Sequence, residues 1–113
     1  MNSFKFDIIN PLLHNELRLK IMVTLDSLKS ANFMYLCEIT GASRGNVSVQ
    51  LKMLQEAGYL KVNRSGSGPS ARSVCSITRL GREALCAYEQ GLRRLFERDV
   101  PAQEDNEKAI ENK

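Results

Sequence analysis

The residues of this chain that are able to do chemistry are mostly hydrogen-bond donors and cations, gathered in and after one short segment. That segment, ASRGNVSVQLKMLQEAGYL, covers residues 42–60 and has apolar residues at helical spacing. Its outer face lacks the long, strongly solvated side chains usual on a core helix. If Val47, Leu51 and Leu54 face inward, an advance of about 100° per residue predicts the opposite face. That face consists of Gly45, Ser48, Val49 and Lys52, with Asn46 flanking it.

Charge is distributed unevenly around this segment. The chain has 113 residues and a net charge of +3. From Arg44 to Arg82 there are seven basic residues and one acid, Glu56, a local excess of +6, whereas residues 99–113 hold five acids and two lysines, a balance of −3. Such an asymmetry within one small domain favours a surface that faces a polyanion. Nucleic acid is the first candidate.

The sequence offers little support for catalysis or for a metal site. Cys37, Cys75 and Cys86 lack CxxC spacing, and His14 is the only histidine. These residues therefore predict free thiols in a reducing compartment instead of a zinc site or a disulfide framework. SGSGPSAR superficially resembles a phosphate-binding loop, but it lacks the Gly-Lys-Ser/Thr ending and joins two predicted strands. We expect no enzymatic activity, no metal and no cofactor.

Length and composition predict one compact domain, over residues 1–98, followed by a disordered polar tail over residues 99–113. No apolar run approaches the length of about 18 residues that a membrane span needs. The first ten residues, MNSFKFDIIN, do not have the pattern of a signal peptide. We therefore expect a cytoplasmic protein without a membrane segment.

Two helices are predicted before the segment of residues 42–60. Asn10 and Pro11 are a plausible helix start, Asn15 is a plausible restart, and the first helix is expected to reach about Leu28. Its predicted inner stripe consists of Leu17, Ile21, Leu25 and Leu28. After a polar connection at 29–32, a short helix is expected over 33–40, with Leu36 and Ile39 inward and an end at Gly41.

The next elements complete the expected topology. Ser43 is the predicted cap of a helix over about 43–57 that ends at Gly58, so residues 33–57 form a helix-turn-helix. Residues 59–64 and 73–77 have β character and enclose a hairpin tip, or wing, at about 64–72. Thr78 is the predicted cap of a last, long helix. An apolar stripe on that helix extends beyond what a small core covers, and it predicts a homodimer. The stripe consists of Leu85, Tyr88, Leu92, Leu95 and Phe96.

Three motifs in this order resemble the winged-helix transcriptional regulators of the MarR and ArsR type, and most closely a subgroup of small stand-alone winged-helix proteins. The motifs are NPLLHNELRLKIMVTL, SRGNVSVQLKMLQEAGYLKV and SITRLGREAL, over roughly residues 10–90. Ser73 departs from the threonine expected at the base of the wing. The resemblance implies an α+β, mainly α, winged helix-turn-helix. It also implies a homodimer that binds a pseudo-palindromic operator in double-stranded DNA, with the recognition helix in a major groove and the wing at a minor groove.

The candidate residues fit this interpretation chemically. Gly45 allows close approach, Asn46 and Ser48 can donate to phosphates or base edges, and Val49 can meet a thymine methyl group. Arg44 can reach guanine or a phosphate. Arg64 and Arg72 flank the wing and suit phosphates or a narrow minor groove. The predicted DNA-binding set is Ser43, Arg44, Gly45, Asn46, Ser48, Val49, Lys52, Arg64 and Arg72.

Two alternatives stay open at this stage. The basic face is also compatible with a winged helix that captures an acidic protein. A regulator gated by a ligand, metal or oxidant is the other alternative, with Cys37 or Cys86 as the sensing thiol.

Overall fold

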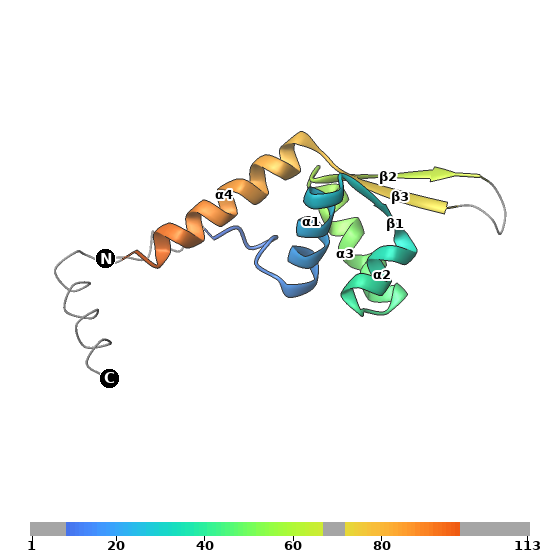
Figure 1. Cartoon of the computed structure of the whole chain (residues 1–113), viewed down its shortest axis with the longest axis horizontal. Helices are drawn as coiled ribbons and strands as arrows, with labels where there is room; N and C mark the ends of the chain where they lie inside the picture. The colour runs from blue at the N-terminus through green and yellow to red at the C-terminus, as the bar shows by residue number, and fades with distance from the viewer. Residues whose placement is uncertain (1–8, 67–71, 98–113) are drawn as a thin grey trace.

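The computed structural model describes residues 9–66 and 72–97. Three helices pack beneath a small sheet, a β-hairpin projects from one side, and the last helix extends to the other side (Figure 1). This arrangement confirms the predicted winged helix-turn-helix class. The elements, in chain order, are α1 (Glu16–Leu28), β1 (Ser30–Asn32), α2 (Phe33–Thr40), α3 (Arg44–Glu56), β2 (Leu60–Ser65), β3 (Arg72–Ile77) and α4 (Arg79–Leu95).

The start of α1 is fixed by Asn15, whose Oδ1 accepts a hydrogen bond of 2.9 Å from the backbone N–H of Arg18. This confirms Asn15 as the cap. Asn10 has a different role from the predicted one, because residues 10–14 form a turn and no helix begins there. In that turn Asn10 Oδ1 accepts from the N–H of Leu12 at 2.9 Å. The predicted inner stripe of α1 is wrong at its end, since Leu28 is 49 % exposed.

The helix-turn-helix forms as predicted, except that α3 ends at Glu56 with Ala57 as its C-cap, one residue before Gly58. α2 ends at Gly41, which has φ of 72°, a conformation that glycine adopts without strain. Ser43 Oγ accepts from the N–H of Asn46 at 3.1 Å and so satisfies an otherwise unpaired donor at the start of α3. The prediction that Ile39 faces inward is wrong, because its side chain is 52 % exposed. α2 is anchored by Leu36 instead, which is fully buried.

The sheet has three antiparallel strands in the order β1-β3-β2, so the predicted two-stranded hairpin gains a third strand. β1 lies where a polar connection was predicted. Its register pairs Ser30 with Ser76 and Asn32 with Val74. The hydrogen-bond partners are more than forty residues away in sequence. A segment of three residues, without alternation of its own, gives no local signal for such pairing.

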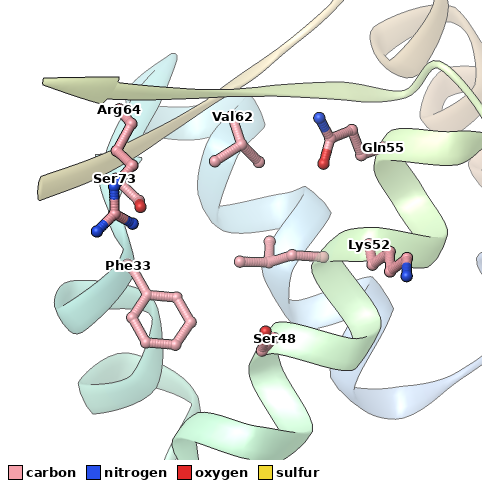
Figure 2. A pocket seen from close by; sticks show the side chains of 8 residues that line it. Phe33, Ser48, Lys52, Gln55, Val62, Arg64 and Ser73 are labelled. Carbon is pink, nitrogen blue, oxygen red and sulfur yellow. The ribbon is translucent and has the colours of Figure 1, made fainter.

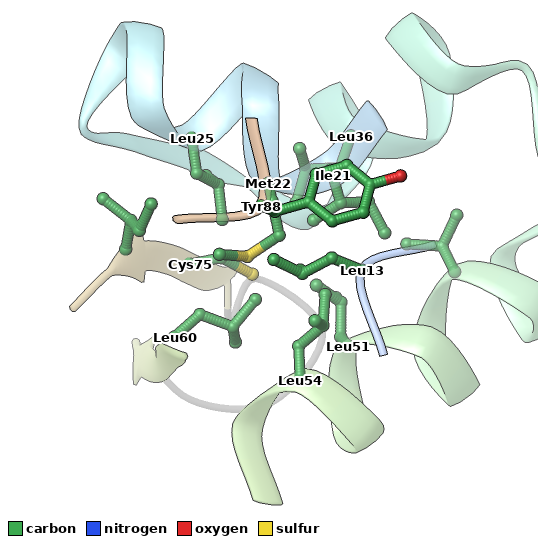
Figure 3. Close-up of a cluster of buried hydrophobic side chains, with 12 residues drawn as sticks. Leu13, Ile21, Met22, Leu25, Leu36, Leu51, Leu54, Leu60, Cys75 and Tyr88 are labelled. Atoms are coloured by element: carbon green, nitrogen blue, oxygen red, sulfur yellow. The ribbon is translucent and has the colours of Figure 1, made fainter. Parts of the chain in front are cut away.

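The core joins all the elements around α1. Figure 3 shows Leu13, from the turn before α1, between side chains of α1 and α3, with Tyr88 of α4 above it. The Tyr88 hydroxyl and His14 Nδ1 form a hydrogen bond of 2.8 Å at the edge of this cluster. No helix within the described ranges is long and apolar enough to cross a membrane. The fully or nearly fully buried apolar residues are Leu13, Ile21, Met22, Leu25, Leu36, Val47, Leu51, Leu54, Leu60, Cys75, Ile77 and Tyr88.

The three cysteines are expected to differ strongly in reactivity. Burial raises the pKa of the Cys75 thiol to about 11, whereas Cys86 is exposed. The thiolate is the nucleophile, and at pH 8 a thiol with a pKa of about 11 has roughly a hundredfold less thiolate than an ordinary thiol, before limited access is counted. Iodoacetamide should therefore alkylate Cys86 first and spare Cys75 until the chain unfolds, as peptide mass spectrometry would show. Equal rates at both sites in the folded protein would contradict this burial.

Candidate nucleic-acid interface

The outer face of α3 is open to solvent, as the helical spacing predicts. The predicted inner residues are all buried, and they hold the helix against α1 and α2. Every predicted contact residue on the helix is exposed, including Val49, whose side chain is 56 % exposed although it is apolar. Space around Gly45 is empty, because a Cβ built there would meet no atom within 4 Å. The exposed residues are Arg44, Gly45, Asn46, Ser48, Val49 and Lys52, with the capping Ser43 before them.

A hollow of about 490 Å³ separates α3 from the hairpin. Figure 2 shows Arg64 extending into it from β2, Ser48 facing it from α3 and Phe33 from the start of α2. The Lys52 side chain extends away from its centre. Because polar groups of the helix and of the hairpin line the same hollow, the two elements present one continuous concave surface. Its lining residues are Phe33, Ser48, Leu51, Lys52, Gln55, Val62, Arg64 and Ser73.

The two wing arginines lie on opposite faces of the hairpin. In the β2–β3 register Arg64 pairs with Ser73, and Ser65 pairs with Arg72. Paired residues project to the same face and successive residues alternate. Arg64 therefore shares a face with Val62, toward α3, and Arg72 projects from the other face. Both are exposed. The predicted tip between them, residues 67–71, lies outside the described residues.

Few carboxylates neutralise this surface. Within residues 9–66 and 72–97 three ion pairs form, and each lies within one helix: Lys20 with Glu16, Arg79 with Glu83, and Arg93 with Glu89. None of them involves the cations of α3 or of the hairpin. The exposed Arg44, Lys52 and Arg64 thus keep their positive charge available to an anionic partner.

Gln50 is a site residue that helical periodicity did not reveal. It is half-buried between the inner and outer faces of α3, and its Oε1 accepts a hydrogen bond of 2.6 Å from Arg18 on α1. Its Nε2 donates to Asn46 Oδ1 at 3.0 Å. The i,i+4 spacing of Asn46 and Gln50 was a readable signal. The contact with Arg18 was not, because it joins residues 32 apart in sequence.

The apolar stripe predicted for dimerisation divides into two parts. Tyr88 is buried in the core of its own chain, and Leu85 and Leu92 pack partly against that core. This part of the stripe is explained within one chain. Leu95 and Phe96 lie beyond the core, and Phe96 is 70 % exposed at the end of α4. The predicted boundary between domain and tail, at residues 98 and 99, and the tail itself lie outside the described residues.

The two candidate sensing thiols lie on different helices. Cys37 is half-buried on α2 and Cys86 is exposed on α4. Among the described residues no three side chains of the His, Cys, Asp and Glu types come together to hold a metal ion.

The site combines an exposed, basic helix, capped at its start by Ser43, with a β-hairpin that has its own arginines. These features define the protein as a winged-helix nucleic-acid-binding domain. The family comparison agrees, since residues 17–96 match the winged helix DNA-binding domain. The chain belongs to this family, and the resemblance predicted from its three motifs is confirmed.

One relative matches this chain in sequence, and solved structures match it in fold. An uncharacterised protein of Methanocaldococcus jannaschii is 32% identical over 71 residues, which cover 63% of this chain and 77% of that protein. The structure of a transcriptional regulator homologue from Pyrococcus horikoshii OT3 matches with a TM-score of 0.74 and 24% identity, over 84% of this chain and 94% of that one. The transcriptional regulator BldR from Sulfolobus solfataricus matches with a TM-score of 0.62 and 17% identity, over 97% of this chain and 85% of that one. At these identities the two structures support the fold.

Proposed function

We propose that the protein is a homodimeric transcriptional regulator, without catalytic activity, that binds a pseudo-palindromic operator in double-stranded DNA. α3 enters the major groove, and the hairpin follows the phosphate backbone toward the neighbouring minor groove. The observation that carries this proposal is the exposed, small and polar face of α3, opposite a fully buried stripe and continuous with the hollow in front of Arg64. A major groove about 12 Å wide admits a helix with such a face.

The two elements divide the work on DNA. Residues in the first turns of α3, among them Arg44, Asn46 and Ser48, lie where a recognition helix meets base edges. Lys52 and Arg64 suit phosphates on the two sides of the hollow, because they provide charge without fixed base geometry. This division gives α3 the sequence preference and the hairpin a contribution to affinity that does not depend on sequence.

Dimerisation completes the proposal. Two recognition helices related by a two-fold axis read an inverted repeat with half-sites about one helical turn apart. Leu95 and Phe96 supply apolar surface at the end of α4 that the described core does not cover. This surface supports α4 as the element that joins two copies.

Selection of bound duplexes from a random pool, followed by affinity measurements across a salt series, tests the function. We expect an inverted repeat and a steep loss of affinity with salt, because about three to five phosphates are neutralised by each protomer. Sedimentation of the protein with the selected duplex should give two chains on one duplex. A flat salt response, or no enrichment of any sequence, would contradict the proposal and leave an acidic protein as the partner of the basic face.

The hairpin provides a matched pair of variants. Arg64→Ala should weaken DNA binding by about tenfold and lower the slope of log affinity against log salt by about one, because Arg64 faces the hollow beside α3. Arg72→Ala removes the same charge from the opposite face of the hairpin and should weaken binding less. Each substitution should weaken binding by the same factor for every DNA sequence. A larger loss for Arg72→Ala would place the DNA backbone on the other face of the wing.

A further inference from the structure

A chain of side-chain hydrogen bonds joins α1 to the outer face of α3. The guanidinium of Arg18 is half-buried and donates from Nε to the carbonyl of Leu12 and from Nη1 to Oε1 of Gln50, both at 2.6 Å. The same Nη1 also lies 3.4 Å from the sulfur of Met53, a weak acceptor. Gln50 Nε2 in turn donates to Oδ1 of Asn46 at 3.0 Å. Asn46 itself is exposed. The chain thus begins at a backbone carbonyl beside the core and ends on the candidate DNA face.

The chemistry of arginine fixes which atom donates and which accepts at each step of this hydrogen-bond chain. A guanidinium has five N–H donors and no acceptor, so the atom of Gln50 that faces it must be the carboxamide oxygen. The amide nitrogen of Gln50 must then face Asn46. Two amide nitrogens facing each other would repel, and Asn46 therefore turns its oxygen toward Gln50. Its Nδ2, with two N–H donors, is left on the side away from Gln50.

From this polarity we infer that Arg18 is a positioning residue that fixes Asn46 as a hydrogen-bond donor toward an acceptor on a base edge in the major groove. The inference rests on the proposed function. Asn46 is the third residue of α3, in the part of a recognition helix that meets base edges. Atoms that suit it include N7 and O6 of guanine and O4 of thymine, whereas N4 of cytosine is a donor and is disfavoured.

The carbonyl of Leu12 explains why arginine is needed here. Nε and Nη of one planar group hold Leu12 and Gln50 at the same time, so the guanidinium cannot rotate without breaking one of the two bonds. The backbone of Leu12 is itself placed by the Asn10 turn and by the neighbouring Leu13 in the core. The orientation of Asn46 is therefore set by the packed part of the domain, before any DNA is bound.

Variants of Gln50 in the full chain test directly which atom of the Asn46 amide faces the DNA. In Gln50→Glu the side chain accepts from Arg18 and has no donor for Asn46, so Asn46 should turn its Nδ2 inward and present its oxygen. We expect selection from a random duplex pool to show a change at one position of each half-site. Preference there should move from acceptor edges toward cytosine by about tenfold. Asn46→Asp, which removes the donor itself, should move the same position in the same direction.

Variants that break the hydrogen-bond chain should weaken the base preference at that position without reversing it. Gln50→Met keeps the length of the side chain and removes both hydrogen bonds, so discrimination at that position should fall by about tenfold while the other positions stay unchanged. Arg18→Met should give the same flattened position, with an unchanged slope of affinity against salt. The control is Gln90→Met, the same change at an exposed residue of α4 outside the concave surface, which should leave the profile unaltered. Thermal unfolding confirms that each variant is folded at the binding temperature.

The outcomes separate the inference from the proposed function. If the wild-type chain enriches a sequence and Gln50→Met or Asn46→Asp keeps the same profile, the inference is wrong and the function stands. If Arg18→Met weakens all sequences equally and lowers the salt slope by about one, Arg18 contacts a phosphate and is not a positioning residue. If the wild-type chain enriches nothing, both the function and the inference are wrong.

Discussion

Gly81→Ala is expected to lower the free energy of unfolding by about 3 kcal/mol or more, at the upper end of what overpacking costs. A Cβ at this position would collide with the carbonyl oxygen of Tyr59 and would lie 3.1 Å from Cγ1 of Ile77. Neither neighbour can give way cheaply, since one is backbone and the other belongs to a nearly buried side chain. Denaturant unfolding followed by circular dichroism measures the loss.

The Tyr59 carbonyl is also held by the first turn of α4. It accepts from the N–H of Thr78 at 3.0 Å, and Oγ1 of Thr78 both donates to the carbonyl of Gly58 at 2.7 Å and accepts from the N–H of Gly81 at 2.9 Å. Moving residues 58–59 away from an alanine would strain the two bonds that join them to Thr78, whereas the bond from Gly81 lies within α4. The substitution therefore acts on the junction that positions α4 against the hairpin.

Gly45→Ala is the control for this prediction. The same change at Gly45 meets no atom within 4 Å, and alanine is the better helix former, so the free energy of unfolding should rise by about 0.5–1 kcal/mol. The change in the free energy of unfolding should thus have opposite signs at the two helical glycines. This difference separates steric exclusion at Gly81 from helix propensity at Gly45. Equal stability of Gly81→Ala and the wild-type chain would show that α4 can separate from β2 without cost.

Local features of the sequence were sufficient to predict most of the elements. The caps at Asn15, Ser43 and Thr78 bond to N–H groups three residues away, so a short window contains both partners. The end of α2 at Gly41 and the buried stripe of α3 are local in the same sense. These features were enough to place the candidate face on α3 with the correct residues exposed.

The remaining features depend on partners that are distant in the sequence. β1 forms only because β3 supplies its hydrogen bonds, and the guanidinium of Arg18 finds Gln50 only once α1 and α3 have packed. Ile39 and Leu28 have the spacing of inward residues, yet no element within residues 9–66 and 72–97 covers them. Likewise, the opposite faces of Arg64 and Arg72 follow from strand register, which the two unpaired segments do not fix.

The second prediction concerns charge on the candidate face itself. Gly45→Glu should abolish most DNA binding, with a loss of affinity of about a hundredfold or more, because a carboxylate would face phosphates and base acceptors in the major groove. The fold should not suffer. Gly45 lies in the first turn of α3, where a carboxylate interacts favourably with the helix dipole, and the site has open space around it.

Gly45→Gln is the matched variant, since glutamine has the size of glutamate without its charge. If charge dominates, Gly45→Gln should retain much more affinity than Gly45→Glu. If both lose affinity equally, close approach of the helix backbone to DNA is the requirement at this position. Mobility shift or fluorescence anisotropy on the selected duplex gives the affinities, and thermal unfolding gives the stabilities.

Opposite effects on stability and binding make this test decisive. A substitution that damages the fold lowers both quantities, whereas Gly45→Glu should raise the melting temperature, since it gains helix propensity and a favourable dipole interaction of about 0.3–1 kcal/mol. A more stable protein that no longer binds DNA can only have lost a surface contact. Unchanged affinity in Gly45→Glu would remove α3 from the interface, because no residue on its outer face could then lie close to the polyanion.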